Sequence, residues 1–344
     1  MVGECEDMCP EFERHEREFQ NTLHPYEKLD GVDGVDHKRA VKRYRRSASD
    51  GFAVLPCDIR PPRVLIKTLD YLFHEIIPTK GLEDSHDFVR DRTRGIRNDF
   101  TLQNYREYEA VECHERIARY HIICASKLMD TENFSLQQEQ EQMRKTLQSL
   151  REYYIDMNKR GIPCPNEAEF QAYYILSHFW QNEIVTMAET LPAHVYDDAR
   201  VQRAIELQQL AQCATAPVFK GMRRALGGLA FSSRLFRVLG DVGTPYLVAA
   251  LVHQEFVRIR CNVLRTMNRA LYDFAPHVDV GELVGLLGCD DEEEVLNILD
   301  YYEIKVEEGM DGRLVAFVGK DVDGNKVKAK FFNGTLLMFW WFKC

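Results

Sequence analysis

Apolar residues follow a helical period from about position 62 onward. The first stripe ends near Pro78 and consists of Val64, Leu65, Thr68, Leu69 and Leu72. Further stripes of the same period predict helices over residues 101–129, 136–157, 167–189, 197–213, 217 onward and 245–271. Antiparallel helix pairs of this size, joined by short loops, are typical of an α-solenoid. No strict sequence period accompanies them, so the predicted repeat is structural only.

The chain before position 62 has little continuous apolar pattern. A short helix is predicted over residues 11–20, directly after Pro10, and glycines and prolines interrupt the rest. We therefore expect an irregular N-terminal arm, residues 1–61, that packs on a helical body instead of forming its own core. The helical-repeat domain is expected over residues 62–273.

The pattern changes again after position 276. Short helices are predicted at 280–287 and 290–302, followed by a short strand at 304–306 and a β-type run at 313–318. A hairpin turn at Asp323-Gly324 precedes a further β-type segment, 326–332. Two short helices followed by a β-wing describe a winged helix, which we expect over residues 274–344. The predicted fold class is mainly α, a solenoid of helical repeats that ends in a winged helix.

Composition restricts the class of protein. The 344 residues are 45% hydrophobic and 28% charged, which fits a globular protein with a sizeable core. No apolar run approaches the ~20 residues of a membrane span, so no membrane insertion is expected. The ten cysteines lack paired spacing, which is typical of reduced thiols in cytosol or nucleus. Cys5 and Cys9 lie near His15, but no second ligand pair follows, and we predict neither a metal nor a cofactor.

Positive charge is concentrated in a chain whose net charge is −10. The three basic clusters are Lys38, Arg39, Lys42, Arg43, Arg45 and Arg46; then Arg90, Arg92, Arg94 and Arg97; and then Arg258, Arg260, Arg265 and Arg269. Such asymmetry is compatible with a phosphate-binding face and equally with solvated helix faces. Because Asp91 and Asp99 can neutralise the second cluster, we interpret it as an internal ion-pair network that seats the arm on the solenoid.

The predicted wing offers another basic face. Lys326, Lys328 and Lys330 alternate along one strand, which places all three side chains on the same side. Together with Arg313 and Lys320 they are the candidate nucleic-acid contacts, through phosphate groups. The other interpretation is a solvated edge strand, in which lysines prevent strand-to-strand aggregation.

No catalytic motif is present in the sequence. The chain lacks a phosphate-binding loop of the Walker type, a His-Glu-x-x-His pair and a Gly-x-Ser-x-Gly elbow. His114, Glu115 and His121 share one predicted helix, where core or surface positions explain them better than a metal site. We therefore do not expect an enzyme.

Several motifs resemble, in order, those of the GANP/suppressor-of-actin (SAC) family of mRNA-export scaffolds. The opening signature consists of Gly3, Cys5, Met8, Cys9, Pro10 and Glu11. The arginine-rich block consists of Phe88, Val89, Arg90, Asp91, Arg92, Arg94, Ile96, Arg97, Asp99 and Phe100. Matching segments also occur at 41–48, 60–72, 115–121 and 166–173, and the resemblance extends loosely to about residue 318.

The resemblance implies a PCI domain, the helical-repeat and winged-helix arrangement named for proteasome lid, signalosome and initiation factor. It further implies a scaffold of the transcription-and-export complex in the nucleus, at the nuclear envelope and nuclear pore. Expected partners are a second PCI protein, a small acidic proteasome-lid-type subunit, nuclear pore components and RNA. It also gives Cys9 the role of a small buried side chain in an arm that Met8 and Pro10 direct.

Two other functions stay open from the sequence. One is a PCI subunit of a protein-degradation or translation complex, which would need neither the Cys5–Cys9 signature nor RNA affinity. The other is a short family member that acts in spindle or centrosome assembly.

Overall fold

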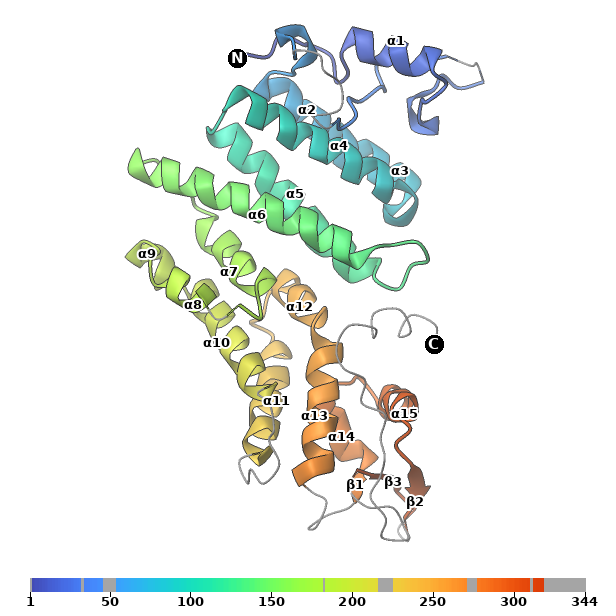
Figure 1. The fold of residues 1–344 in the computed structure, drawn as a ribbon, viewed down its shortest axis with the longest axis vertical. Coiled ribbons are helices and arrows are strands. Elements are labelled where there is room, and N and C mark those ends of the chain that lie inside the picture. Colours follow the sequence, from blue (N-terminus) through green and yellow to red (C-terminus); the bar gives the residue numbers. More distant parts are fainter. Residues whose placement is uncertain are drawn as a thin grey trace. The chain divides into compact units, whose positions relative to one another are not determined.

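The computed structural model describes residues 2–31, 34–45, 54–181, 183–215, 225–270, 277–309 and 312–318. Within these residues the chain is mainly helical with little sheet, consistent with an α-solenoid (Figure 1). It divides into two compact units, Met1–Phe170 and Gln171–Cys344, called here the N-terminal and C-terminal units. None of the described helices combines the length and the apolar character needed to cross a membrane.

The N-terminal unit consists of an arm followed by layered helices (Figure 1). Its helices are α1 (Glu11–Phe19), α2 (Pro62–Tyr71), α3 (Ile77–Lys80), α4 (Leu82–Gln103), α5 (Tyr108–Lys127) and α6 (Leu136–Lys159). Helix α2 packs on α4 and α5, and α5 packs extensively on α6. Pro62 begins α2 at a position whose backbone N–H would have no partner in the helix, so the missing donor costs nothing there.

Helix α4 is the main correction in this unit, because it carries the arginine-rich block that the apolar pattern did not predict as a helix. Its buried apolar residues are Phe88, Val89, Ile96 and Phe100, whose successive spacings of one, seven and four residues place them on one face of the helix. The single predicted helix 101–129 is wrong. The chain leaves α4 at Asn104, whose φ of 48° is left-handed, and α5 begins at Tyr108. The predicted helices 11–20 and 136–157 are confirmed by α1 and α6.

The C-terminal unit continues the helical pattern with shorter elements. They are α7 (Glu167–Ser177, which begins in the preceding unit), α8 (Glu183–Ala188), α9 (Ala193–Tyr196), α10 (Ala199–Ala214), α11 (Ala225–Leu239), α12 (Tyr246–His253) and α13 (Phe256–Ala270). Helix α10 confirms the prediction at 197–213. The predicted helices 167–189 and 245–271 are each divided into two, because a continuous apolar stripe does not show where a chain turns between packed helices.

A three-stranded antiparallel sheet follows α13. Its strands are β1 (His277–Asp279), β2 (Val306–Glu308) and β3 (Leu314–Phe317), in the order β1-β3-β2, with Ala316 paired to Val278 on one side and to Val306 on the other. Helices α14 (Val280–Leu287) and α15 (Glu292–Tyr301) confirm the two predicted short helices. Strand β1 was not predicted, and β2 lies two residues later than expected. The predicted strand at 326–332 lies outside the described residues.

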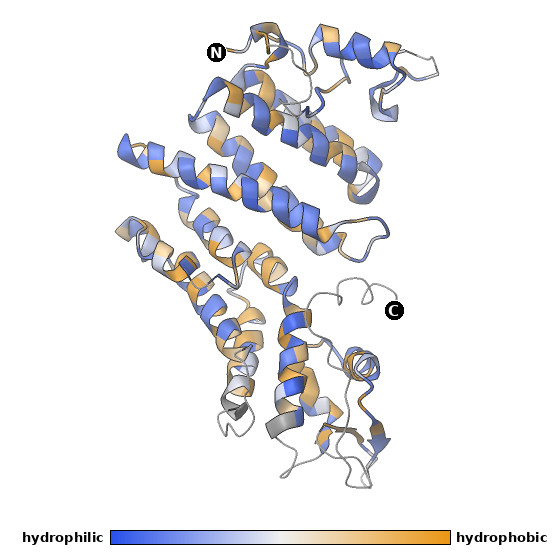
Figure 2. Cartoon of the chain, in the orientation of Figure 1, coloured by the Kyte–Doolittle hydropathy of each residue, from blue (hydrophilic) through white to orange (hydrophobic). Residues whose placement is uncertain are grey.

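The end of α14 is held by two close contacts. Gly288 has a φ of 62°, and a Cβ there would lie 2.2 Å from Cδ1 of Phe236 on α11. Buried Arg260 of α13 donates from Nε to the Leu287 carbonyl at 2.9 Å and from Nη2 to the Gly288 carbonyl at 2.8 Å. Its Nη1 pairs with Glu294 of α15 at 2.8 Å. The Arg260 guanidinium thus joins α13, α14 and α15. Helices α12 and α14 consist mainly of apolar residues (Figure 2).

Candidate functional site

The opening signature lies in the arm and is fixed by backbone contacts. Gly3 donates to Gln103 Oε1 at 3.0 Å, and a Cβ at Gly3 would lie 2.6 Å from the Ile59 carbonyl oxygen. The backbone N–H of Cys5 donates to that same carbonyl at 2.9 Å. The Met8 carbonyl accepts from the Lys42 N–H at 2.9 Å. The first residues therefore run along residues 56–60, where only glycine fits at position 3.

Cys9 is completely buried and lies in a small cluster with Val35, Ala40 and Leu23. Its Sγ accepts a hydrogen bond from Arg17 Nη2 at 3.1 Å. Burial raises the pKa of the Cys9 thiol to about 12, so the thiol is neutral at physiological pH. A neutral, buried thiol is suited to packing, and neither to nucleophilic chemistry nor to metal binding. Pro10 precedes the first residue of α1.

One buried carboxylate joins the arm to α4. Glu27 Oε2 accepts from Arg17 Nη1 at 2.6 Å and from Arg92 Nη2 at 3.0 Å. Its Oε1 accepts from the Val41 N–H at 2.8 Å. Burial alone would raise the pKa of Glu27, but Arg92 and Arg17 beside it hold that pKa below its ordinary value. The carboxylate is therefore ionised and compensates two buried guanidinium groups.

A second buried carboxylate repeats this arrangement. Asp99 and Arg60 are both fully buried, and Asp99 Oδ2 accepts from Arg60 Nε at 2.8 Å. Asp99 Oδ1 accepts from Lys42 Nζ at 2.7 Å. Asp91 is likewise used by the arm, since its Oδ2 accepts from the Tyr44 N–H at 3.3 Å as well as from Arg92.

The four arginines of the block have different partners. Arg92 contacts Glu27 of the arm, as described above. Arg90 donates to Gln138 at 3.1 Å and Arg97 donates to Gln142 at 2.6 Å, both on α6. Arg94 lies over the Tyr44 ring, 3.7 Å from its centroid. The structure thus brings Arg92, Asp91 and Asp99 to the arm, and it places Arg90 and Arg97 against α6.

A group of potential metal ligands lies between α4, α5 and α6. Ligand atoms of His86, Cys124 and Glu139, all buried, lie within 4.8 Å of one another. The Glu139 carboxylate accepts from His86 Nε2 at 3.0 Å and from His121 Nδ1 at 2.6 Å. Burial alone would raise the pKa of Glu139, but the two imidazoles lower it to about 2, and burial raises that of the Cys124 thiol. We interpret the group as a hydrogen-bonded network, because both carboxylate oxygens already have donors.

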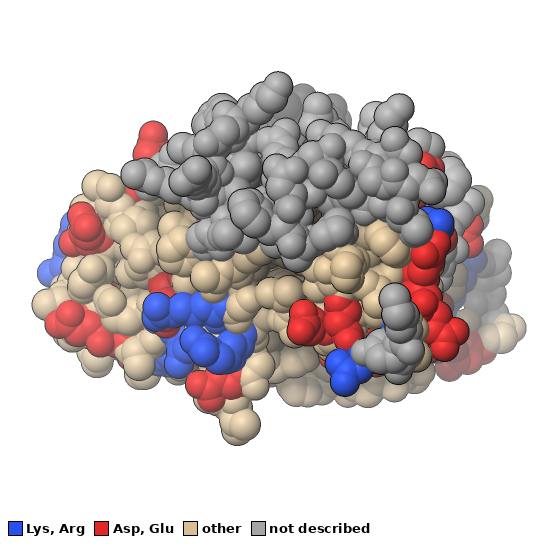
Figure 3. Space-filling view, turned by 90° about the horizontal axis from the view of Figure 1, so that it is seen from below, with Lys and Arg blue, Asp and Glu red and all other residues tan. Residues whose placement is uncertain are grey.

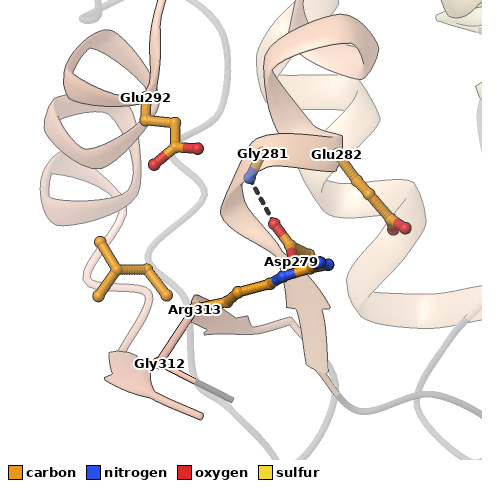
Figure 4. Close-up of a pocket in the computed structure, with 7 residues that line it drawn as sticks. Asp279, Gly281, Glu282, Glu292, Gly312 and Arg313 are labelled. Carbon is orange, nitrogen blue, oxygen red and sulfur yellow. Dashed lines mark hydrogen bonds and ion pairs between the residues drawn. The ribbon is translucent and has the colours of Figure 1, made fainter.

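The described part of the predicted wing is acidic around Arg313. A shallow pocket is lined by Asp279, Gly281, Glu282, Glu292, Gly312, Arg313 and Leu314 (Figure 4). Arg313 Nη1 lies 3.4 Å from Asp279 Oδ2, and the other oxygen of Asp279 accepts from the Gly281 N–H at 2.7 Å. Asp and Glu side chains gather on the right-hand side of the face in Figure 3. The other candidate nucleic-acid contacts, Lys320, Lys326, Lys328 and Lys330, lie outside the described residues.

Several residues that organise these sites were not predicted. Glu27, Arg60 and Glu139 are completely buried charged groups. Carboxylates and guanidinium groups are ordinarily solvated, so an isolated sequence offers no signal that these particular ones are inside. The only local sign is the position of Arg60, directly before Pro61 and Pro62, which are the N-cap and the first residue of α2.

Comparisons with known proteins match most of the chain. The sequence profile of the SAC3/GANP family matches residues 8–308. The chain is 41% identical over 342 residues to SAC3 family protein 1 of Schizosaccharomyces pombe, covering 98% of the chain and 33% of that protein. It is 32% identical over 327 residues to Protein xmas of Drosophila melanogaster, covering 91% of the chain and 15% of that protein. It is 30% identical over 324 residues to SAC3 family protein B of Arabidopsis thaliana, covering 89% of the chain and 18% of that protein. The chain therefore spans a third or less of the length of these relatives.

Proposed function

Because the chain belongs to the SAC3/GANP family, we propose that it is a non-enzymatic scaffold of the nuclear complex that couples transcription to mRNA export. Family membership is the observation that carries this proposal. The proposed location is the nucleus, at the nuclear envelope and nuclear pore. The proposed partners are a second PCI protein, a small acidic proteasome-lid-type subunit, nuclear pore components and RNA.

The proposed architecture is a PCI domain in three parts. An N-terminal arm comprises residues 1–61, a helical-repeat domain residues 62–273 and a winged helix residues 274–344. The layered helices and the order of two short helices with a small antiparallel sheet support this division. A winged helix presents both a helix surface and a sheet edge, which suits pairing with the corresponding element of a second PCI protein.

We propose that Lys326, Lys328 and Lys330, with Lys320, carry the RNA affinity of the winged helix. Arg313 contributes less than these lysines, because Asp279 pairs with it and Glu282 and Glu292 line the same pocket. Helix α15, which has the position of a recognition helix in this arrangement, begins with Glu292, Glu293 and Glu294. These carboxylates would repel phosphate groups. RNA therefore contacts the wing, and the acidic start of α15 faces elsewhere.

Two experiments test the proposal. Affinity purification of the tagged chain from nuclear extract should recover a second PCI protein and a small acidic subunit. Recovery of a proteasome lid or an initiation-factor complex in their place would refute the export assignment. Salt-dependent RNA binding should be lost when Lys326, Lys328 and Lys330 are changed to Glu. The matched control changes exposed Lys38, Lys67 and Lys159 to Glu, which alters the net charge equally and should retain the binding.

A further inference from the structure

The two aspartates of the arginine-rich block do not neutralise all of its arginines. Asp91 contacts Arg92 and the backbone of the arm, and Asp99 contacts Arg60 and Lys42. Within the part of the chain that the structure describes, neither Arg94 nor Arg97 forms an ion pair with a carboxylate. The arm therefore contacts both of these aspartates, and two positive side chains one helical turn apart are left without an ion-pair partner among the described residues.

Arg94 is held flat by the arm. Its guanidinium carbon lies 3.7 Å from the centroid of the Tyr44 ring, and the side chain is only partly buried. Stacking on a ring face fixes the plane of a guanidinium group but leaves its N–H donors, which lie in that plane, free to meet an acceptor. Tyr44 is itself positioned by the hydrogen bond from its N–H to Asp91.

Arg97 has fewer partners than its charge requires. Its Nη2 donates to the neutral amide oxygen of Gln142 at 2.6 Å, and its buried Nε has no hydrogen-bond partner among the described residues. Burial and the nearby charge of Arg94 lower the pKa of Arg97 to about 10. The side chain is therefore still charged at neutral pH. A bound anion would raise the pKa of Arg97 again and would offer its Nε a hydrogen-bond acceptor.

The neighbouring charged side chains of α4 and α6 form their hydrogen bonds and ion pairs with other residues. Arg90 donates to Gln138 and lies 3.4 Å from Asp87, at a position nearer the start of α4. The hydrogen bond from Lys145 is the main cause that lowers the pKa of Glu141 on α6, and the charge of Arg94 lowers it to a smaller extent. Glu141 is thus paired with Lys145 and forms no ion pair with Arg94 among the described residues.

We infer that Arg94 and Arg97, supported by Tyr44 and Gln142, form a phosphate-binding site that contacts the backbone of single-stranded RNA. Two adjacent guanidinium groups present several N–H donors, which matches the two unesterified oxygens of a phosphodiester. RNA is the polyanion that the proposed function brings to this chain, and the inference rests on that function. This site lies in the N-terminal unit and is separate in sequence from the lysines of the wing.

The test compares two double variants that remove the same charge. Arg94→Gln/Arg97→Gln removes the proposed contacts and retains hydrogen-bonding side chains of similar length. Arg106→Gln/Arg160→Gln is the control, because these arginines are already paired, with Asp156 at 2.6 Å and Glu107 at 2.7 Å. Binding of a fluorescein-labelled 20-nucleotide poly(U) RNA to the full chain is measured by anisotropy between 50 and 300 mM KCl, after circular dichroism has shown that each variant is folded.

The expected change follows from counter-ion release. Each phosphate that is neutralised on a single strand contributes about 0.7 to the slope of log K against log salt, so losing the one phosphate held by Arg94 and Arg97 lowers the slope by about 0.7. Extrapolated from 1 M to 0.1 M salt, that slope corresponds to an affinity about 5-fold weaker. The control variant should retain the slope of the unaltered chain.

A third variant, with Lys326, Lys328 and Lys330 changed to Glu, separates this inference from the proposed function. Loss of binding in both the arginine and the wing variants supports both. Loss in the wing variant alone overturns the inference and leaves the proposed function intact. Loss in the arginine variant alone supports the inference and refutes the role of the wing. An unaltered chain without RNA affinity overturns both. If the change of Arg94 and Arg97 abolishes binding of a protein partner and leaves RNA binding intact, the inference alone is overturned.

Discussion

Changing Asp99 to Asn should release the arm from the helices of the N-terminal unit. Asp99 is fully buried and accepts from Arg60 Nε at 2.8 Å and from Lys42 Nζ at 2.7 Å. Asparagine has nearly the same shape, but it is neutral and has one acceptor oxygen and one NH2 donor. One of the two cations would therefore face a donor, and both would lose their counter-charge in a buried position.

The magnitude follows from the burial of the pair. Removing one partner of a buried ion pair costs about 3–5 kcal/mol. At the lower limit, about 3 kcal/mol raises the population of the open arm by roughly 150-fold. The exposed pair of Asp156 with Arg106 supplies the matched control, because such surface pairs contribute about 0–1 kcal/mol. Asp156→Asn should therefore leave the arm closed.

Hydrogen–deuterium exchange read by mass spectrometry is the appropriate assay. All three tryptophans, at 180, 340 and 341, lie in the C-terminal unit, so intrinsic fluorescence would not report on the arm. The informative amides are those of Glu4, Cys5 and Lys42, which donate to carbonyls of Pro56, Ile59 and Met8. Peptides that contain them should exchange far faster in Asp99→Asn than in Asp156→Asn. Equal exchange in the two variants would show that Asp99 does not hold the arm.

Three further predictions concern packing and titration. Gly288→Ala should destabilise the C-terminal unit by about 2 kcal/mol, because Gly288 has a φ of 62° and the Phe236 ring lies close to it. Gly285→Ala is the control, since a Cβ at that position has no neighbour within 4 Å. In urea unfolding followed by tryptophan fluorescence, equal midpoints of the two variants would show that this reasoning is wrong. Burial and the charge of Arg97 lower the pKa of His114 to about 3 in the folded chain. Below about pH 6.5 the unfolded chain therefore binds a proton at His114 that the folded chain does not bind. The free energy of unfolding consequently falls as the pH is lowered below about 6.5. Between pH 7.0 and 4.5 the loss is about 2.5 kcal/mol, and His114→Phe should reduce this pH dependence in urea titrations followed by circular dichroism. Iodoacetamide should label exposed Cys57 in the folded chain long before buried Cys9, and similar rates in mass spectra would contradict the packing of the arm.

The apolar pattern predicted which segments are helical better than it predicted the residues at which the helices begin and end. Helices α6, α10, α14 and α15 were predicted nearly at their observed positions, because each carries a regular apolar stripe or a clear change of pattern. Helix α4 was missed since its charged residues outnumber the apolar ones, and several of those charges are buried against the arm. The pairing of Arg92 with Glu27 joins residues 65 positions apart in the sequence, and no local period encodes such a contact.

The arm and the proposed phosphate site depend on each other. Asp91 lies three residues before Arg94 on α4 and would be the natural partner of that arginine in an isolated helix, and Asp99 lies two residues after Arg97. The seated arm instead supplies Lys42 and Arg60 to Asp99 and its backbone to Asp91. It also places the Tyr44 ring beneath Arg94. The two positive side chains are consequently available to an external anion only while the arm is in place, so Asp99→Asn should weaken RNA binding at this site even though Asp99 itself carries a negative charge.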